Sequence, residues 1–253
     1  MLTDSRRLSQ PEETLFFAIE TRNNDAHTFV GNLYALGVRN FVVTRRLPEW
    51  DHFTDANFLK VKNSLSALQK IASHHRAKFD IPVIGITGSN GKTIVKEWLY
   101  QLLEKNFSVV RSPRSYNSQI GVPLSVWQLD EQAELGIFEA GISMPDEMEL
   151  LEPIIKPTIG VLTKIGEAHQ ENFTSLQQKC MEKLELFTNC DVFIFDEDNE
   201  LVSRCVDLMV LSQKTFSWSR QNRDAHLFIS SIRKRDERTE IHYSFLNFDY
   251  SFV

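Results

Sequence analysis

The chain has 253 residues, of which 42% are hydrophobic and 25% charged, a composition typical of a soluble globular protein of one or two domains. Its formal net charge of −6 at pH 7 argues against a nucleic-acid-binding protein, and no apolar run approaches the roughly 20 residues needed to cross a bilayer. The N-terminus has no apolar signal segment and Cys180, Cys190 and Cys205 form no metal-binding pair, so we expect reduced thiols in the cytoplasm.

Residues 1–80 are predicted to form a small α/β domain. Apolar, β-branched runs alternate with a helix-like segment, and a second helix repeats its apolar residues at helical spacing. Strands are expected at 14–19, 40–44 and 59–61, and helices at 28–36 and 64–75. Asp80 and Pro82 mark the end of this domain, because the residue before a proline is disfavoured in a helix.

Residues 81–253 are predicted to form an α/β domain with a mostly parallel sheet and helices on both faces, because strand-like and helix-like segments alternate. The expected strands are 83–87, 107–111, 135–140, 158–163 and 191–195, separated by helices near 92–104, 120–128, 146–151 and 174–188. After Leu208 the pattern changes, and it predicts an antiparallel hairpin region with strands at 225–232, 239–246 and 248–253. The sequence stops inside an apolar run, which leads us to expect a truncated domain.

A loop typical of nucleotide-binding enzymes follows the first of these strands. Gly88 and Gly91 would let the backbone approach phosphate oxygens, and amides at the start of a helix point toward an anion. Lys92 adds a positive charge for the outer phosphates, and the hydroxyl of Thr93 suits Mg²⁺. The predicted ATP-binding residues are Thr87, Gly88, Ser89, Asn90, Gly91, Lys92 and Thr93. The alternative is a glycine turn between a strand and a helix, with a solvated lysine.

Two further candidates lie at the carboxyl ends of predicted strands, where an open α/β sheet forms its crevice. Glu139 could hold Mg²⁺, which prefers carboxylate and phosphate oxygens, and a solvated loop residue is the alternative. His169, in the segment Ile-Gly-Glu-Ala-His at 165–169, could be a ligand or an orienting donor, although a lone loop histidine is more often ordinary.

Lys183 and the pair Asn117–Ser118 are candidates that depend on their surroundings. Lys183 lies at the edge of the apolar stripe of predicted helix 174–188, where an inward lysine needs a partner or a changed charge. A surface lysine whose stem alone is buried is the alternative. Asn117 and Ser118 offer groups that suit a polyhydroxylated or amide-rich ligand, and the alternative is a turn followed by a helix cap.

The order and spacing of these motifs resemble the Mur ligases of peptidoglycan synthesis. The motifs are Ile86–Thr93 (ITGSNGKT), Tyr116–Pro123 (YNSQIGVP), Glu139–Gly141 (EAG), Ile165–His169 (IGEAH) and Lys183–Glu185 (KLE). The second and fourth are similar to those of the branch that adds D-alanyl-D-alanine. Segments that resemble the family's UDP-sugar domain are Asp4–Arg6 (DSR), Leu15–Ala18 (LFFA) and Asp25–Phe29 (DAHTF).

The resemblance implies an ATP-dependent amide ligase that joins D-Ala-D-Ala to UDP-MurNAc-tripeptide through an acyl phosphate. ATP and Mg²⁺ would be its cofactors, and no pyridoxal phosphate site is implied in this chain. Residues 1–80 would bind the UDP-substrate and residues 81–253 would bind ATP. The implied catalytic residues are Lys92, Glu139, His169 and Lys183. The implied metal ligands are Thr93, Glu139, His169 and, if carbamylated, Lys183. The implied substrate-binding residues are Ser5, Arg6, Asn117 and Ser118.

Members of the family also have an adenine-contacting stretch and a third domain for the dipeptide, which have no counterpart here. We therefore expect a fragment that binds nucleotide weakly and does not complete turnover. Some relatives carry a fused alanine racemase, and the present motifs look like theirs. One alternative is a folylpolyglutamate synthase-like ligase, although that family starts directly with its ATPase domain. The other is a non-catalytic nucleotide-binding module, which would not need Glu139, His169 and Lys183 together.

Overall fold

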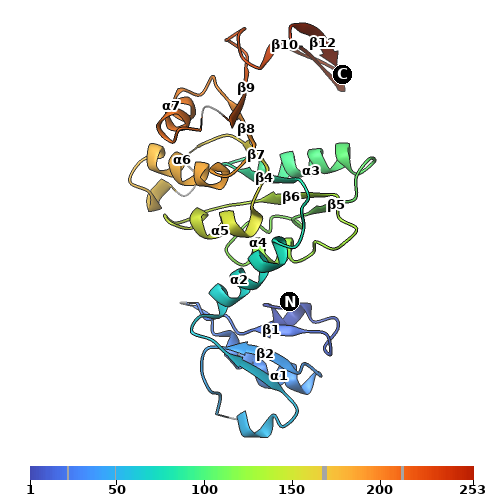
Figure 1. The fold of residues 1–253 in the computed structure, drawn as a ribbon, viewed down its shortest axis with the longest axis vertical. Coiled ribbons are helices and arrows are strands. Elements are labelled where there is room, and N and C mark those ends of the chain that lie inside the picture. The colour runs from blue at the N-terminus through green and yellow to red at the C-terminus, as the bar shows by residue number, and fades with distance from the viewer. Residues whose placement is uncertain (22, 49, 167–169, 212–213) are drawn as a thin grey trace. The chain divides into compact units, whose positions relative to one another are not determined.

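The structure of the protein is a computed structural model that describes residues 1–253 apart from 22, 49, 167–169 and 212–213. The chain divides into two compact units, Met1–Ala77 and Lys78–Val253 (Figure 1). Both units contain a sheet with parallel strands and helices, which confirms the predicted α/β class. Among the helices within the described ranges, none combines the length and the apolar character that a bilayer crossing requires.

The first unit is built on a parallel sheet in the order β1-β2-β3. The strands are β1 (Leu15–Phe17), β2 (Asn40–Val43) and β3 (Asn57–Lys60), and the helices are α1 (Val30–Ala35) and α2 (Ser64–Arg76). Phe16, Leu33 and Phe41 belong to one buried core, because strand side chains of one face meet the apolar side of α1. Short 3-10 turns are found at Ser5–Arg7, Ala26–Phe29 and Trp50–His52.

The second unit contains a nine-stranded sheet in the order β12-β11-β10-β9-β8-β7-β4-β6-β5 (Figure 1). The strands are β4 (Val83–Thr87), β5 (Val109–Arg111), β6 (Leu135–Glu139), β7 (Ile159–Leu162), β8 (Val192–Asp196), β9 (Thr215–Ser219), β10 (Leu227–Arg235), β11 (Arg238–Phe245) and β12 (Phe248–Phe252). The pairs from β5 to β10 are parallel, and β10, β11 and β12 are antiparallel. Both predicted parts of this sheet are therefore confirmed.

The helices of the second unit differ from the prediction in two places. They are α3 (Lys92–Leu103), α4 (Gly121–Val126), α5 (Met148–Ile155), α6 (Leu176–Leu184) and α7 (Glu200–Leu208). The single helix predicted at 174–188 is wrong, because α6 ends at Leu184 and a 3-10 turn at Glu185–Phe187 follows. This turn places Phe187 against the sheet, beside Gly160 of β7. Helix α7 and strand β9 were not predicted, although Asn199 caps α7 by accepting a hydrogen bond from the amide of Val202.

Strand β4 lies between β6 and β7, where the order of the strands reverses, and ligands bind at such places in open α/β sheets. On one face of the sheet, Ile84 and Ile86 pack with Val95 and Leu99 of α3. This packing fixes the start of α3 above the carboxyl end of β4.

Candidate functional site

The loop between β4 and α3 has a backbone that its two glycines permit. Gly88 has a φ of +143° and Gly91 a φ of +87°, values that L side chains rarely adopt. A Cβ atom at Gly88 would lie 2.0 Å from Oγ1 of Thr163, so only glycine fits beside the end of β7. No side chain of the described residues caps the N-terminus of α3, and the first amides of this helix can therefore bind an anion.

The segment that follows β7 holds this loop from one side. The carbonyl of Lys164 accepts hydrogen bonds from the amides of Ser89 (2.8 Å) and Asn90 (3.4 Å). The carbonyl of Gly166 accepts a hydrogen bond from Oγ of Ser89 at 3.0 Å. The loop is thus held by main-chain acceptors of a neighbouring strand end.

Lys92 is the first residue of α3, and its side chain is partly buried. Its Nζ donates a hydrogen bond to the carbonyl of Gly88 at 2.8 Å. Burial lowers the pKa of Lys92, and the carboxylate of Glu139 partly offsets this effect. The alternative of a freely solvated lysine is therefore wrong.

Glu139 ends β6, and its side chain is fully buried. Its Oε2 accepts a hydrogen bond from Oγ1 of Thr93 at 2.9 Å. Its Oε1 has no hydrogen-bond partner among the described residues, although Nζ of Lys96 lies 4.0 Å away. Burial raises the pKa of Glu139, against the opposing effects of Thr93, Lys96 and Lys92. The alternative of a solvated loop residue is wrong, and a buried carboxylate oxygen remains open for a cation.

Lys183 lies on α6 and is 3% exposed, so the alternative of a surface lysine is also wrong. Burial lowers its pKa to about 7, and the neighbouring ammonium groups of Lys92 and Lys179 contribute to this decrease. Lys179, one helical turn earlier, is 1% exposed, and its Nζ donates a hydrogen bond to the carbonyl of Gly166 at 2.5 Å. The segment after β7 is therefore held between the loop that joins β4 to α3 and helix α6.

Asn117 and Ser118 lie near the strand end that carries Glu139. The carbonyl of Asn117 accepts a hydrogen bond from the amide of Gly141 at 2.8 Å, and a Cβ atom at Gly141 would lie 3.1 Å from Cγ of Asn117. Oγ of Ser118 accepts a hydrogen bond from the amide of Gly121 at the start of α4. Ser118 therefore binds the first amide of helix α4, as the alternative of a helix cap proposed. Ligand binding by Asn117 or Ser118 stays a prediction.

The remaining predicted residues are separate from this group. Ser5 and Arg6 belong to the first unit, where Arg6 is exposed and pairs with Asp4 at 2.8 Å. His169 lies outside the described residues. The second unit thus brings together Lys92, Thr93, Glu139 and Lys183 of the predicted set.

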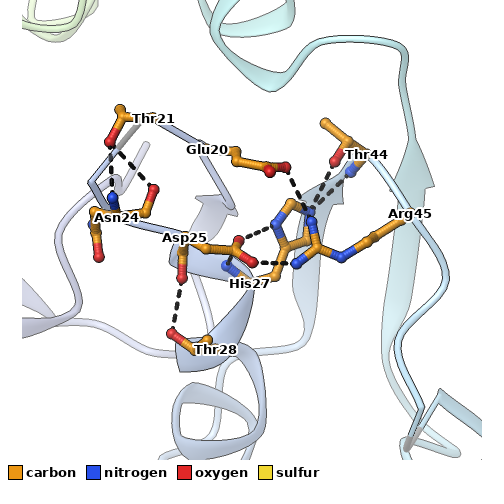
Figure 2. A network of polar contacts seen from close by, with 8 residues as sticks. All are labelled: Glu20, Thr21, Asn24, Asp25, His27, Thr28, Thr44 and Arg45. Carbon is orange, nitrogen blue, oxygen red and sulfur yellow. Dashed lines mark hydrogen bonds and ion pairs between the residues drawn. The ribbon is translucent and has the colours of Figure 1, made fainter.

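The first unit has a polar network around His27, which is buried (Figure 2). Nε2 of His27 accepts a hydrogen bond from the amide of Thr44 at 3.0 Å, so Nδ1 carries the proton and donates to Oδ1 of Asp25 at 2.7 Å. Arg45 pairs with Asp25 and with Glu20. Although burial acts in the opposite direction, hydrogen bonds from His27 and Arg45 lower the pKa of Asp25 to about 2.

This network borders a cavity of about 690 Å³ in the first unit. Among its lining residues are Arg45, His27, His52 and Phe53, which offer a cation, two imidazoles and an aromatic face. Glu20, Asp25 and His27 could approach a metal ion together, but the guanidinium of Arg45 already pairs with both carboxylates. The cavity suits an anionic ligand with a planar ring better than a metal ion.

Arg45 and three residues around Thr93 and Glu139 were not predicted from the sequence. Arg45 lies two residues after the end of β2, and a basic residue near a parallel strand end is the signal that could have been used. Lys96 follows Thr93 by three residues on α3, so helical spacing places both on adjacent turns of one face. The three missed residues around the site are Lys96, Ser112 and Ser115.

Comparison with known proteins places these features in a family. Residues 86–252 match the family model described as the Mur ligase middle domain. The chain is 36% identical over 205 residues to the UDP-N-acetylmuramoyl-tripeptide–D-alanyl-D-alanine ligase of Borreliella burgdorferi, covering 78% of this chain and 44% of that relative. It is 32% identical over 184 residues to the ligase of the same name from Bacillus subtilis, covering 73% and 39%. The chain thus spans less than half the length of these two relatives.

Solved structures share the fold. MurF from Acinetobacter baumannii has a TM-score of 0.87 and 22% identity, covering 99% of this chain and 54% of that chain. MurF from Thermotoga maritima in complex with ADP has a TM-score of 0.82 and 22% identity, covering 99% and 56%. The apo form of L. casei FPGS has a TM-score of 0.57 and 13% identity, covering 73% and 55%.

Proposed function

The chain belongs to the Mur ligase family, and from this premise we propose that it supplies the ATP site and the UDP-substrate site of a ligase that joins D-Ala-D-Ala to UDP-MurNAc-tripeptide. The observation that carries the proposal is the buried carboxylate of Glu139, hydrogen-bonded to the half-buried Thr93 beside the uncapped start of α3. A carboxylate that is buried next to an anion-binding helix end needs a cation between itself and the anion. A nucleoside triphosphate with its divalent ion meets both requirements.

The residues at this place fit Mg²⁺. Oε1 of Glu139 is a buried oxygen without a hydrogen-bond partner in the described part of the chain, and the Thr93 hydroxyl is a second hard oxygen donor. We propose that Thr93 and Glu139 hold the ion, with His169 and a carbamylated Lys183 at a further metal position. When bound, Mg²⁺ would neutralise charge on the phosphate oxygens.

The reaction that we propose has two steps. A terminal carboxylate oxygen of UDP-MurNAc-tripeptide attacks the γ-phosphorus of ATP, and ADP leaves as the acyl phosphate forms. The amine of D-Ala-D-Ala then attacks the acyl carbon, and inorganic phosphate leaves from a tetrahedral intermediate. The role of the chain is alignment and charge neutralisation, since Lys92 and the first amides of α3, which no side chain of the described residues caps, would face the phosphates.

Substrate binding is assigned by the same proposal. Ser5 and Arg6 would contact the UDP-linked part, and Asn117 and Ser118 would contact the muramoyl peptide. Arg45 and the cavity next to it support an anionic, ring-bearing ligand in the first unit. A cytoplasmic location is supported by three free, buried cysteines, since cytosolic thiols remain reduced.

Calorimetric titration of this chain with the ATP analogue AMP-PCP in the presence of Mg²⁺ tests the proposal. We expect binding by the wild type and a loss of at least about tenfold in affinity for Lys92→Ala and for Glu139→Gln, because each removes a charged contact. Lys105→Ala, at an exposed lysine beyond the end of α3, is the matched control and should bind normally.

Two results would count against the proposal. A wild-type chain that binds neither AMP-PCP nor UDP-MurNAc-tripeptide would overturn it. Binding of a folate in place of UDP-MurNAc-tripeptide would instead support a folylpolyglutamate synthase-like activity, the fold alternative represented by the FPGS structure.

A further inference from the structure

Lys96 is a buried cation that the proposed reaction does not use. It lies on α3, three residues after Thr93, and its side chain is 0% exposed. A buried ammonium group is costly unless its donors have acceptors, so the groups around Lys96 decide what this side chain does.

Three acceptors surround the Nζ atom. It donates hydrogen bonds to the carbonyl of Ser112 at 2.7 Å and to the carbonyl of Arg114, and it lies 3.1 Å from Oε1 of Glu97. Glu97 also pairs with Arg111 at 2.8 Å. Lys96 therefore fixes the segment 112–114, which follows β5, against helix α3.

Each of the two carbonyl contacts leads to a proposed metal ligand. Oγ of Ser112 accepts a hydrogen bond from the amide of Glu139 at 3.2 Å. Next to Arg114, Oγ of Ser115 lies 3.2 Å from Oγ1 of Thr93. The ammonium group of Lys96 thus helps to position Ser112, which contacts Glu139, and Ser115, which contacts Thr93.

The backbone that Lys96 holds is strained. Arg114 has a φ of +52°, in the left-handed region that a non-glycine residue adopts only at a cost. The hydrogen bond from Lys96 to the Arg114 carbonyl is a contact that offsets this cost and keeps the turn in place.

The charge of Lys96 is a weaker influence than its geometry. Its Nζ lies closer to Oε1 of Glu97 (3.1 Å) than to Oε1 of Glu139 (4.0 Å), so its charge acts first on Glu97, which Arg111 also contacts. The main effect of removing Lys96 is then a displaced segment around Thr93 and Glu139.

We propose that Lys96 is a positioning residue of the metal–nucleotide site, which acts through Ser112 on Glu139 and through Ser115 on Thr93. This inference rests on the proposed function. It predicts that Lys96 supports the Mg²⁺-dependent part of nucleotide affinity, whereas Lys92 and the loop amides supply the part that does not need the ion.

The test is calorimetric titration of the chain with AMP-PCP, once with Mg²⁺ and once with EDTA. The ratio of the two affinities measures the contribution of the ion. For Lys96→Met, which keeps an unbranched apolar side chain but removes the ammonium group, we expect this ratio to fall by about tenfold or more, with the affinity in EDTA within about twofold of the wild type. A general loss of stability would lower both affinities together. Lys105→Met is the control and should keep the wild-type ratio.

A second substitution tests the strained turn. Glycine adopts a positive φ without steric cost, so Arg114→Gly in the Lys96→Met background should recover part of the lost ratio. Should Lys96→Met fail to fold, Ser115→Ala removes the contact with Thr93 at an exposed position, and we expect it to lower the same ratio severalfold.

The outcomes separate the two proposals. A wild-type chain without AMP-PCP binding overturns the proposed function and this inference with it. Binding by the wild type with an unchanged ratio in Lys96→Met, or with an unchanged ratio in Ser115→Ala, overturns the inference alone. A ratio that rises in Lys96→Met also overturns the inference, because repulsion between Lys96 and the metal ion would then be its main effect. So does an Arg114→Gly substitution that recovers none of the lost ratio, because Lys96 would then not act through this turn.

Discussion

Helix α6 buries two lysines and a glutamate: Lys179, Glu182 and Lys183 are 1%, 8% and 3% exposed. The amphipathic pattern of the sequence placed Lys183 at the edge of the apolar stripe and left a surface position open, whereas the structure buries it. Burial, together with the ammonium groups of Lys92 and Lys179, lowers the pKa of Lys183 to about 7. A lysine with this pKa is largely a neutral, nucleophilic amine at slightly alkaline pH.

The first residue-scale prediction concerns this amine. We expect Nζ of Lys183 to attack CO₂, forming a C–N bond and releasing one proton, so that a carbamate results. With ¹³C-labelled bicarbonate, the NMR signal of the carbamate should be present at pH 8 and decline as the pH falls through about 7, where the amine is protonated. Lys183→Arg should abolish the signal and the control Lys105→Arg should keep it. A signal that persists in Lys183→Arg would contradict the assignment.

A second prediction at this scale concerns Glu185. Burial raises its pKa from 4.5 to about 7, with further contributions from Glu182, Glu149 and Asp146. Between these two pH values the folded state binds more protons than the unfolded state, so the free energy of unfolding should fall as the pH rises from about 4.5 to about 7. Urea unfolding at pH 5 and pH 7.5 should show a smaller decrease for Glu185→Gln than for the wild type. An equal decrease in both proteins would argue against this assignment.

At the scale of elements, the turn after α6 packs against strand β7 because the ring of Phe187 lies directly on Gly160. A Cβ atom at Gly160 would lie 2.4 Å from Cδ1 of Phe187, whereas a Cβ atom at Gly31 in α1 would meet its nearest neighbour, Phe53, at 3.9 Å. Gly160→Ala should therefore destabilise the second unit by about 1–3 kcal/mol, because the ring must move. Gly31→Ala, the control, should be neutral or stabilising by up to about 1 kcal/mol. Urea unfolding of both variants measures the difference, and equal stabilities would refute the packing argument.

The elements that sequence analysis located well have strong local signals. Strand β4 was predicted with its observed bounds, since all five residues of Val83–Thr87 are buried and a glycine follows. Helix α7 and strand β9 were missed, although α7 has nine residues, as many as α6, and Asn199 before it is a good N-cap. In the site, Lys92 and Glu139 are found beside the loop as expected from their motifs. The contacts of Lys96 were not predictable from spacing, because they depend on the pairing of β5 with β6.

For the whole molecule, the two compact units predict separate responses to ligands. Each unit has its own buried core, with Phe16 and Phe41 in the first and Ile84 and Ile137 in the second. In differential scanning calorimetry, AMP-PCP with Mg²⁺ should raise the transition temperature of the second unit and leave that of the first unit unchanged. At a hundredfold excess of ligand over Kd, the expected stabilisation of the second unit is about 2.7 kcal/mol. UDP should raise the transition temperature of the first unit and leave that of the second unit unchanged. One transition that shifts with either ligand would contradict independent units.

The topology of the second unit also has a consequence for the protein during its synthesis. Strand β4 is made before both of its neighbours, and Val83 bonds to Thr158, which lies 75 residues later. At the usual speed of translation, roughly 4 to 15 s pass before that partner exists. Until β6 is made, the nascent polypeptide carries β4 as an apolar segment without any pairing strand, and until β7 is made one edge of β4 stays unpaired. Chaperone contact on the ribosome would therefore matter more for this segment than for the terminal hairpins, whose strands are only two residues apart.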